Sequence, residues 1–161
     1  MRRVGQFWRH ASARVTAQER ASAEQILGSL APLFLELPVN DQRHGLDVLE
    51  TVTRLEGQPS HLLQQAALLH DLGKGEAHFS VIERSLTVFL RAVSPRTLSA
   101  LQRSRPAFAR RYGIYADHAR IGAERLRAAG AAELAGIVGE HHATHPQSEV
   151  TRRLQRADGR N

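Results

Sequence analysis

An adjacent histidine and aspartate, His70 and Asp71, stand where the apolar run Ala66–Leu69 meets a glycine-rich turn. The imidazole offers a neutral nitrogen ligand, and the carboxylate can bridge two cations. A polar pair at the end of a buried helix contributes poorly to a hydrophobic core. We therefore interpret His70 and Asp71 as a metal-binding corner. The alternative is a helix-terminating pair whose aspartate accepts backbone hydrogen bonds.

Lys74, which follows this corner, is the single lysine of the chain. The chain has 22 basic residues and the other 21 are arginines, so its one compact ammonium group lies beside the candidate metal site. Lysine binds phosphate as a point charge, whereas arginine binds it as a planar fork. We predict that Asp71 and Lys74 are the catalytic residues, with Lys74 neutralising charge that develops on a phosphate. A lysine that only forms part of the turn is the alternative.

Four further histidines and a distant aspartate complete the candidate ligand set. His44 lies early in one predicted helix, His118 opens another, and His141 and His142 close an apolar one. Asp158 lies near the end of the last predicted helix. These residues would have to converge inside a helical bundle, which is a known way to build metal sites. The alternatives are a core histidine at His44, a helix N-terminal residue at His118, histidines favoured by the helix dipole at 141–142, and an exposed tail carboxylate at Asp158.

The pattern of apolar residues decides the fold class. They recur every three or four positions along almost the whole chain, and strand-like alternation is nearly absent. This predicts an all-α, single-domain helical bundle with the metal centre in its core. Residues 1–16 are expected to form a basic N-terminal arm or short helix, and residues 17–161 the metal-binding domain. The predicted helices span about 17–35, 42–55 and 79–92, with one between them that Ser60 caps and that ends at the His70–Asp71 corner. Two more begin at Pro95 and Pro106, and the last three span about 117–129, 131–142 and 147–157.

Taken in order, these residues resemble the motifs of the HD-domain superfamily of metal-dependent phosphohydrolases. The similarity extends over roughly residues 40–160 and is greatest to the two-metal branch that includes the HD-GYP phosphodiesterases. The segment His70–Lys74 resembles that branch's His-Asp-Ile-Gly-Lys, and His118–Ala123 resembles its His-Pro-x-x-Gly-Ala. Ala119 replaces the proline, and no Gly-Tyr-Pro segment follows His141–His142. The absence of that segment argues against hydrolysis of cyclic di-GMP.

The resemblance implies a dinuclear centre in an HD-type metal-dependent hydrolase domain over 17–161. A water bridging the two ions, with a lowered pKa, would be the nucleophile. The expected cofactors are two divalent first-row metal ions, Fe or Mn foremost, with Zn, Ni, Co or Mg as alternatives. The chain has no cysteine, so thiolate ligands are excluded. The resemblance assigns His44, His70, Asp71 and Asp158 to one ion, and Asp71, His118 and His141, His142 or both to the other.

The net charge of +6 permits anionic partners such as nucleotides, nucleic acid or a membrane surface. Two arginine clusters could serve nucleic acid, although solvated helix faces are the simpler interpretation. No apolar run approaches the ~20 residues of a membrane span, and the N-terminus lacks the apolar core of a secretory signal. We therefore expect a cytoplasmic protein with no membrane span, of undetermined oligomeric state. The clusters are Arg91, Arg96, Arg103, Arg105, Arg110 and Arg111, and Arg152, Arg153, Arg156 and Arg160.

The residues and the resemblance together predict a metal-dependent phosphohydrolase or phosphodiesterase. Its partner would be a small, phosphorylated, nucleotide-like substrate, cleaved at a phosphoester or phosphoanhydride. One alternative is a non-catalytic basic domain that binds nucleotide or nucleic acid and keeps metal for structure. The other is an HD-type di-iron oxygenase, because that chemistry uses the same ligands. Metal identity together with a redox test would distinguish the oxygenase from the phosphohydrolase. Turnover of phosphoesters would distinguish the phosphohydrolase from the non-catalytic binding domain.

Overall fold

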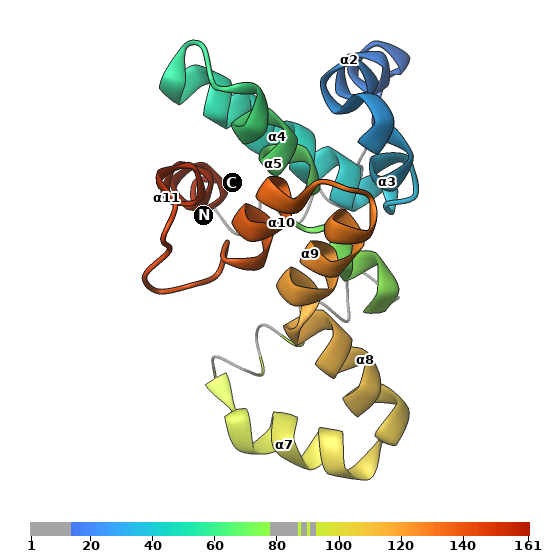
Figure 1. Cartoon of the computed structure of the whole chain (residues 1–161). Helices are drawn as coiled ribbons and strands as arrows, with labels where there is room; N and C mark the ends of the chain where they lie inside the picture. Colours follow the sequence, from blue (N-terminus) through green and yellow to red (C-terminus); the bar gives the residue numbers. More distant parts are fainter. Residues whose placement is uncertain (1–13, 78–86, 88–89, 91–92) are drawn as a thin grey trace.

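The computed structural model describes residues 14–77, 87, 90 and 93–161. Over these residues the chain is largely helical and contains no strand, which confirms the predicted all-α fold (Figure 1). The elements are α2 (Ala17–Leu27), η1 (Gly28–Leu30), α3 (Ala31–Leu35), α4 (Val39–Glu56), α5 (His61–Leu69), η2 (Leu72–Ala77), α7 (Pro95–Ser104), α8 (Pro106–Ala116), α9 (His118–Ala128), α10 (Ala132–Gly139) and α11 (Glu149–Asp158), where η marks a 3₁₀ segment.

The predicted helix over 17–35 is divided into α2, η1 and α3. It begins where expected, since Thr16 and Glu19 form a capping box at the start of α2. It is interrupted at Gly28, whose φ of 55° lies in the left-handed region that glycine tolerates. Pro32, in the first turn of α3, has no N–H to continue the helical ladder across the break. The prediction of one continuous helix is therefore wrong.

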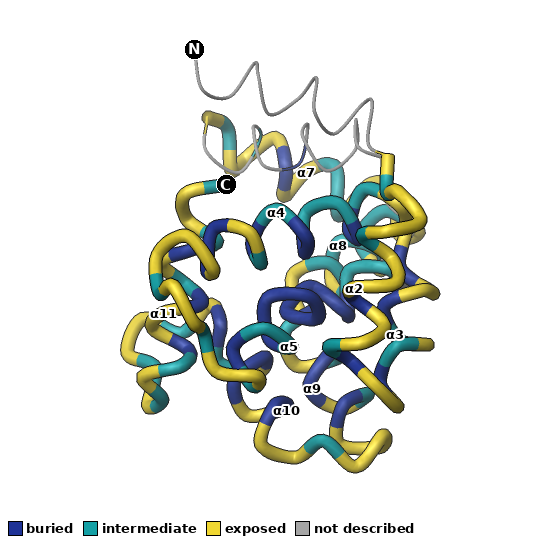
Figure 2. Tube along the Cα trace, turned by 90° about the horizontal axis from the view of Figure 1, so that it is seen from above, coloured by how far each residue is buried: buried dark blue, intermediate teal, exposed yellow. Residues whose placement is uncertain are grey.

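α5 is the central helix of the fold. Leu63, Ala66 and Leu68 are each at most 1% exposed. The helix packs against α2, α3, α4, α10 and α11, and Figure 2 shows it enclosed by elements whose outer faces are exposed. A helix that is apolar nearly all round is stable only when it is surrounded in this way. The helix that precedes His70 and Asp71 therefore ends inside the core.

α4 runs beside α5 and begins earlier than the sequence predicts. The backbone N–H groups of Asp41 and Gln42 both donate to the Pro38 carbonyl, so the helical ladder starts at Val39 rather than at Gln42. Asn40 and Asp41, whose side chains could cap a helix that begins at Gln42, both lie inside the first turn of α4 and do not cap it. The added turn does not move His44, which stays in the first half of α4.

The C-terminal helices place the remaining candidate ligands. α9 begins at His118, within one residue of the prediction. α10 ends at Gly139, three residues before the predicted end, so His141 and His142 lie in the turn that follows. The His141 N–H bonds to Val138, three residues back, which tightens the chain out of the α-helix. α11 extends to Asp158, one residue beyond the prediction, and packs against α4 and α5.

α7 and α8 form a helical hairpin that extends from the body of the fold (Figure 1). They begin at Pro95 and Pro106, as predicted, because proline is suited to the first turn of a helix. α8 packs against η2 and α9, and this contact joins the hairpin to the elements that carry Lys74 and His118.

Two predicted segments lie outside the described residues, the helix over 79–92 almost wholly and the basic arm over 1–16 mostly. The predicted boundary between 16 and 17 coincides with the start of α2. The division into an arm and a domain stays a prediction. None of the described helices is long and apolar enough to cross a membrane.

Candidate metal centre

His70 and Asp71 lie at the inner end of α5, almost completely buried, at 1% and 4% exposure. The Nδ1–H of His70 donates to the Ala67 carbonyl at 3.0 Å, which directs Nε2 away from its own helix. Both His70 Nε2 and Asp71 Oδ1 are buried without a hydrogen-bond partner among the described residues. Burying a polar atom without a hydrogen bond destabilises the fold, so these two atoms are candidates for binding a group such as a metal ion.

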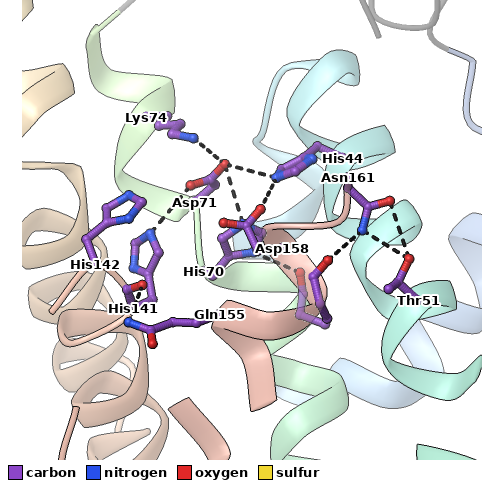
Figure 3. Close-up of polar contacts among 12 residues, drawn as sticks. His44, Thr51, His70, Asp71, Lys74, His141, His142, Gln155, Asp158 and Asn161 are labelled. Atoms are coloured by element: carbon purple, nitrogen blue, oxygen red, sulfur yellow. Dashed lines mark hydrogen bonds and ion pairs between the residues drawn. The ribbon is translucent and has the colours of Figure 1, made fainter. Parts of the chain in front are cut away.

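His44 and Asp158 complete a first triad with His70. His44 Nε2 is 3.0 Å from Asp158 Oδ1, and His70 Nε2 is 3.7 Å from the same oxygen. The three ligand atoms lie within 4.8 Å of one another and could hold a metal ion. They come from α4, the end of α5 and the end of α11, and Figure 3 shows the three side chains pointing toward one another.

His118, His141 and His142 form a second triad, which could also hold a metal ion. His118 Nδ1–H donates to the Tyr115 carbonyl at 2.7 Å, and His141 Nδ1–H donates to the Val138 carbonyl at 2.6 Å. In the neutral form of each ring, Nε2 then carries a lone pair. The Nε2 atoms of His118 and His141 are nevertheless 3.3 Å apart. Two facing lone pairs at this distance repel unless a cation lies close to both.

Asp71 lies between the two triads and presents a different oxygen to each. Its Oδ2 is 3.7 Å from His44 Nε2 and 3.6 Å from His70 Nε2. Its Oδ1 is 3.4 Å from His118 Nε2 and 3.8 Å from His141 Nε2. This is the arrangement that a bridging carboxylate requires, and Figure 3 shows the side chain between the His44–His70 side and the His141–His142 side.

Both carboxylates are held in the ionised form. Burial would raise the pKa of Asp71, but the Lys74 ammonium and the nearby imidazoles hold it well below its usual range. Burial would also raise the pKa of Asp158, but the hydrogen bond with His44 and the nearby His70 imidazole lower it. The pair therefore supplies two negative charges to a buried space.

His70 and the His141–His142 pair belong to different triads, and their pKa values shift in opposite directions. Burial would lower the pKa of His70, but the nearby Asp71 and Asp158 carboxylates raise it. Burial, aided by the charge of His70, lowers the pKa of His141 to about 3. Burial and the charge of His118 lower the pKa of His142. The rings of His141 and His142 therefore stay neutral at physiological pH, as metal ligands must.

Lys74 lies beside the bridging carboxylate. Its Nζ is 2.5 Å from Asp71 Oδ2 and 5.9 Å from the centre of the Tyr115 ring. Burial would lower the pKa of Lys74, but Asp71 raises it, so the ammonium stays charged. The side chain is 18% exposed, compared with 5% for Asp71. The predicted contact of Lys74 with a substrate phosphate stays a prediction.

Three glycines let the ligand-bearing elements approach closely, and sequence reasoning missed this role. A Cβ at Gly73 would lie 2.1 Å from the His118 carbonyl oxygen, and one at Gly122 would lie 3.2 Å from the Gly73 nitrogen. A Cβ at Gly45 would lie 2.9 Å from the Leu68 carbonyl oxygen. The sequence pattern places Gly73 only in a glycine-rich turn after the predicted helix. The sequence signal was available, because Gly45 and Gly73 each lie within two residues of a predicted ligand.

α11 and the residues that follow it are tied to neighbouring segments of the site through two further polar residues, Gln155 and Asn161, that sequence reasoning missed. The Gln155 amide donates to the carbonyls of His141 (3.1 Å) and Ala143 (2.8 Å), which fixes the turn that carries the His141–His142 pair. The Asn161 amide donates to Thr51 Oγ1 on α4 at 3.0 Å. Figure 3 shows Gln155 and Asn161 on opposite sides of Asp158. Their types alone give no signal, because polar residues are ordinary on an exposed helix.

The structure therefore brings every predicted ligand together, including both members of the His141–His142 pair. The assignment of these residues to metal ions stays a prediction. Among the other histidines in the described residues, His61 bonds to the Ile26 carbonyl at 2.7 Å and His145 is exposed. His10 and His78 lie outside the described residues.

The fold and the site together define an all-α domain whose buried histidines and aspartates fit divalent metal ions. Residues 42–160 match the HD domain family, and the chain belongs to this family. HD domains bind divalent metals, and members of the family are generally hydrolases. The predicted superfamily is thus confirmed, whereas the two-metal branch stays a prediction. Comparisons with curated proteins and with solved structures find no match.

Proposed function

We propose that the protein is a dinuclear metal-dependent phosphohydrolase that cleaves a phosphoester or phosphoanhydride of a nucleotide-like substrate. The observation that carries this proposal is the position of Asp71, whose two oxygens face two separate ligand triads. One ion would not need both triads. Membership of the HD domain family supports metal-dependent hydrolysis as the reaction class.

The donor set favours transition metals. It contains five imidazoles and two carboxylates, and imidazole suits Fe, Mn, Co, Ni and Zn better than Mg, which prefers oxygen. The carbonyl bonds of His70, His118 and His141 fix which ring nitrogen faces the centre. We infer that the His44, His70 and Asp158 triad holds one ion and the all-histidine triad the other, with Asp71 bridging.

Two divalent ions bound there would lower the pKa of a water and offset charge on a phosphoryl group. The chain's own residues prepare this chemistry. Asp71 stays ionised between the triads, and His141 stays neutral. Lys74 keeps its ammonium at the exposed edge of the centre, where a substrate phosphate oxygen would meet it.

Exposure indicates the side from which substrate approaches. His70 is 1% exposed, whereas Asp158 is 28% exposed and His44 and Lys74 are each 18% exposed. His142 is also exposed. The open side is therefore bordered by metal ligands and one ammonium, which favours a compact anionic group such as a phosphate.

Elemental analysis of protein purified without chelator tests the metal centre, and a panel of nucleotides, cyclic dinucleotides and a generic phosphodiester tests the reaction. We expect close to two first-row ions per chain and metal-dependent release of phosphate or nucleotide. A content of zero or one ion that Mn or Fe does not raise would overturn the dinuclear centre. Two bound ions per chain with no turnover would favour the non-catalytic domain that binds nucleotide or nucleic acid. Oxygen consumption by a reducible di-iron centre would favour the HD-type oxygenase.

Lys74 offers a test of the phosphate contact. Lys74→Ala should leave the metal content unchanged and lower kcat/KM about ten- to a hundredfold, because one charge-assisted contact is worth roughly 1.5–3 kcal/mol. Lys74→Arg should restore activity only in part, because a planar fork does not fill the site of a compact ammonium. Wild-type kcat/KM in Lys74→Ala would reduce this residue to a structural lysine of the turn.

A further inference from the structure

The hairpin formed by α7 and α8 is basic and free of acidic residues. Pro95–Ala116 contains five arginines and no Asp or Glu, although 16 acidic residues in a chain of 161 would place about two in a segment of this length. Four of the five arginines have exposed side chains: Arg96, Arg103, Arg105 and Arg110.

Several arginines elsewhere in the fold form ion pairs with acidic residues. Arg43 pairs with Glu19 and Asp47, and Arg153 pairs with Glu56 and Glu149. By contrast, Arg96, Arg103, Arg105 and Arg110 form no ion pair with any residue that the structure describes. Exposed charges that are not neutralised locally raise the positive potential of the surface. In the second predicted arginine cluster, Arg152 and Arg153 pair with Glu149, and only Arg156 and Arg160 lack an ion pair among the described residues, so the hairpin carries more charge that is not neutralised locally.

The spacing of these arginines fits a repeating anion. Arg96 and Arg103 are seven residues apart, so they lie on one face of α7 and are separated by about 10 Å along its axis. Successive phosphates of one DNA strand advance about 3.4 Å along the duplex axis, so three steps cover about 10 Å of that axis. Arg105 lies between the two helices, and Arg110 extends the exposed positive charge onto α8.

We propose that the α7–α8 hairpin is a docking surface for the phosphodiester backbone of a nucleic acid. A membrane surface fits less well, because a helix that inserts into lipid needs exposed apolar residues. The exposed large hydrophobic residues of the described chain are Leu35, Leu55, Val39 and Val93, and none lies in the hairpin. The aromatic residues of α8 are half-buried, so binding through phosphates rather than base stacking is expected.

The hairpin also connects to the metal centre. α8 packs against η2 and α9, which carry Lys74 and His118. A backbone bound on the hairpin would therefore lie next to the element that borders the open side of the centre. The docking surface does not depend on the proposed hydrolysis, because it rests on charge and spacing alone.

Fluorescence anisotropy with a fluorescein-labelled DNA duplex of ~20 base pairs, titrated between ~50 and ~200 mM salt, tests this surface. The test variant replaces Arg96, Arg103, Arg105 and Arg110 with Gln. A matched control replaces Arg14, Arg20, Arg127 and Arg156, which are exposed residues elsewhere, with Gln. Both variants lower the net charge from +6 to +2 (6 − 4 = 2), so they separate the surface from bulk charge.

We expect the hairpin variant to lose about tenfold or more in affinity at low salt and its salt slope to become shallower by up to about 3–4, with the control changing much less. Metal content and hydrolysis of a small phosphodiester should not change in the hairpin variant. Equal losses in both variants, or no salt-dependent binding by the unmodified protein, would overturn the proposal. Binding to anionic phospholipid vesicles without binding to DNA would also overturn it. A protein that binds DNA through the hairpin but turns over no phosphoester would refute the proposed hydrolysis alone.

Discussion

The two triads on either side of Asp71 differ in charge and in how the fold supports them. The His44, His70 and Asp158 triad has its own carboxylate and draws its ligands from three helices of the core. The His118, His141 and His142 triad contains no carboxylate, and two of its rings lie in the turn after α10. The first triad includes a carboxylate and lies in a packed core, whereas the second consists of imidazoles alone and depends on a turn.

This difference predicts different metal affinities. A divalent ion at the first triad would meet two carboxylates, Asp158 and Asp71, whereas an ion at the second would meet only Asp71. Coulombic attraction is strong where water is excluded, so the first site should fill first and release its ion last. The second site should exchange its ion more readily, because the His141 ring is oriented only by donating to a backbone carbonyl and its turn is held by the Gln155 amide of α11.

Asp71→Asn should have the largest effect, because it removes the one group that both triads share. The amide keeps the size of the side chain but loses the charge that offsets the repulsion between two ions. We expect metal content below one ion per chain and a loss of activity of roughly 10³-fold or more. Elemental analysis and turnover check both, and retention of two ions would show that Asp71 does not bridge.

Gly73→Ala should disrupt the junction between the two triads. Its Cβ would lie 2.1 Å from the His118 carbonyl oxygen, and backbone atoms cannot yield as a side chain does. We expect a loss of about 3 kcal/mol or more in the free energy of unfolding, or failure to fold. Gly136→Ala is the matched control, because its Cβ would meet nothing within 4 Å, and it should be neutral or slightly stabilising. Denaturant unfolding compares the two, and equal stability would contradict the close approach.

His118→Ala and His44→Ala should separate the two sites. His118→Ala should lose the second ion and keep the first, because Asp158, His70 and Asp71 still surround the first site. His44→Ala should weaken the first site instead. Titration of chelator-stripped protein with Mn would resolve two binding steps in the unmodified chain and one in His118→Ala. The exposed His145 serves as control, and identical curves for the two variants would remove the assignment of separate sites.

Local sequence signals were sufficient to single out the His70–Asp71 pair and to predict the fold class. A polar pair at the end of an apolar helix stands out, as His70 and Asp71 do, because burial without a partner is costly. The spacing of apolar residues gave the helices, except where one residue decided the backbone. Glycine also occurs inside many helices, so its presence at position 28 does not by itself predict a break. The left-handed conformation of Gly28 is seen only in the folded chain, where α2 and α3 pack against the core.

Features that depend on distant contacts could not be predicted. The contact between Gly73 and His118 joins residues 45 positions apart (118 − 73 = 45), and nothing near either residue signals it. The end of α10 three residues early also follows from a local tightening of hydrogen bonds rather than from composition. Gln155 is similar, since an amide on an amphipathic helix normally faces solvent, and only the folded position of the His141 turn gives it a partner.

Gln155→Leu should have the smallest of these effects, and it tests whether the second triad depends on α11. Leucine keeps much of the volume but cannot donate to the carbonyls of His141 and Ala143. We expect about tenfold weaker binding of the second ion and little change in the first, as for other groups that orient metal ligands. Gln64→Leu is the matched control, because Gln64 donates to the Pro59 carbonyl at 3.0 Å away from the centre. A general loss of stability would lower Tm in both variants without changing the ratio of the two metal affinities. An unchanged ratio in Gln155→Leu would therefore mean that the backbone carbonyls alone position His141, and that α11 contributes only Asp158 to the centre.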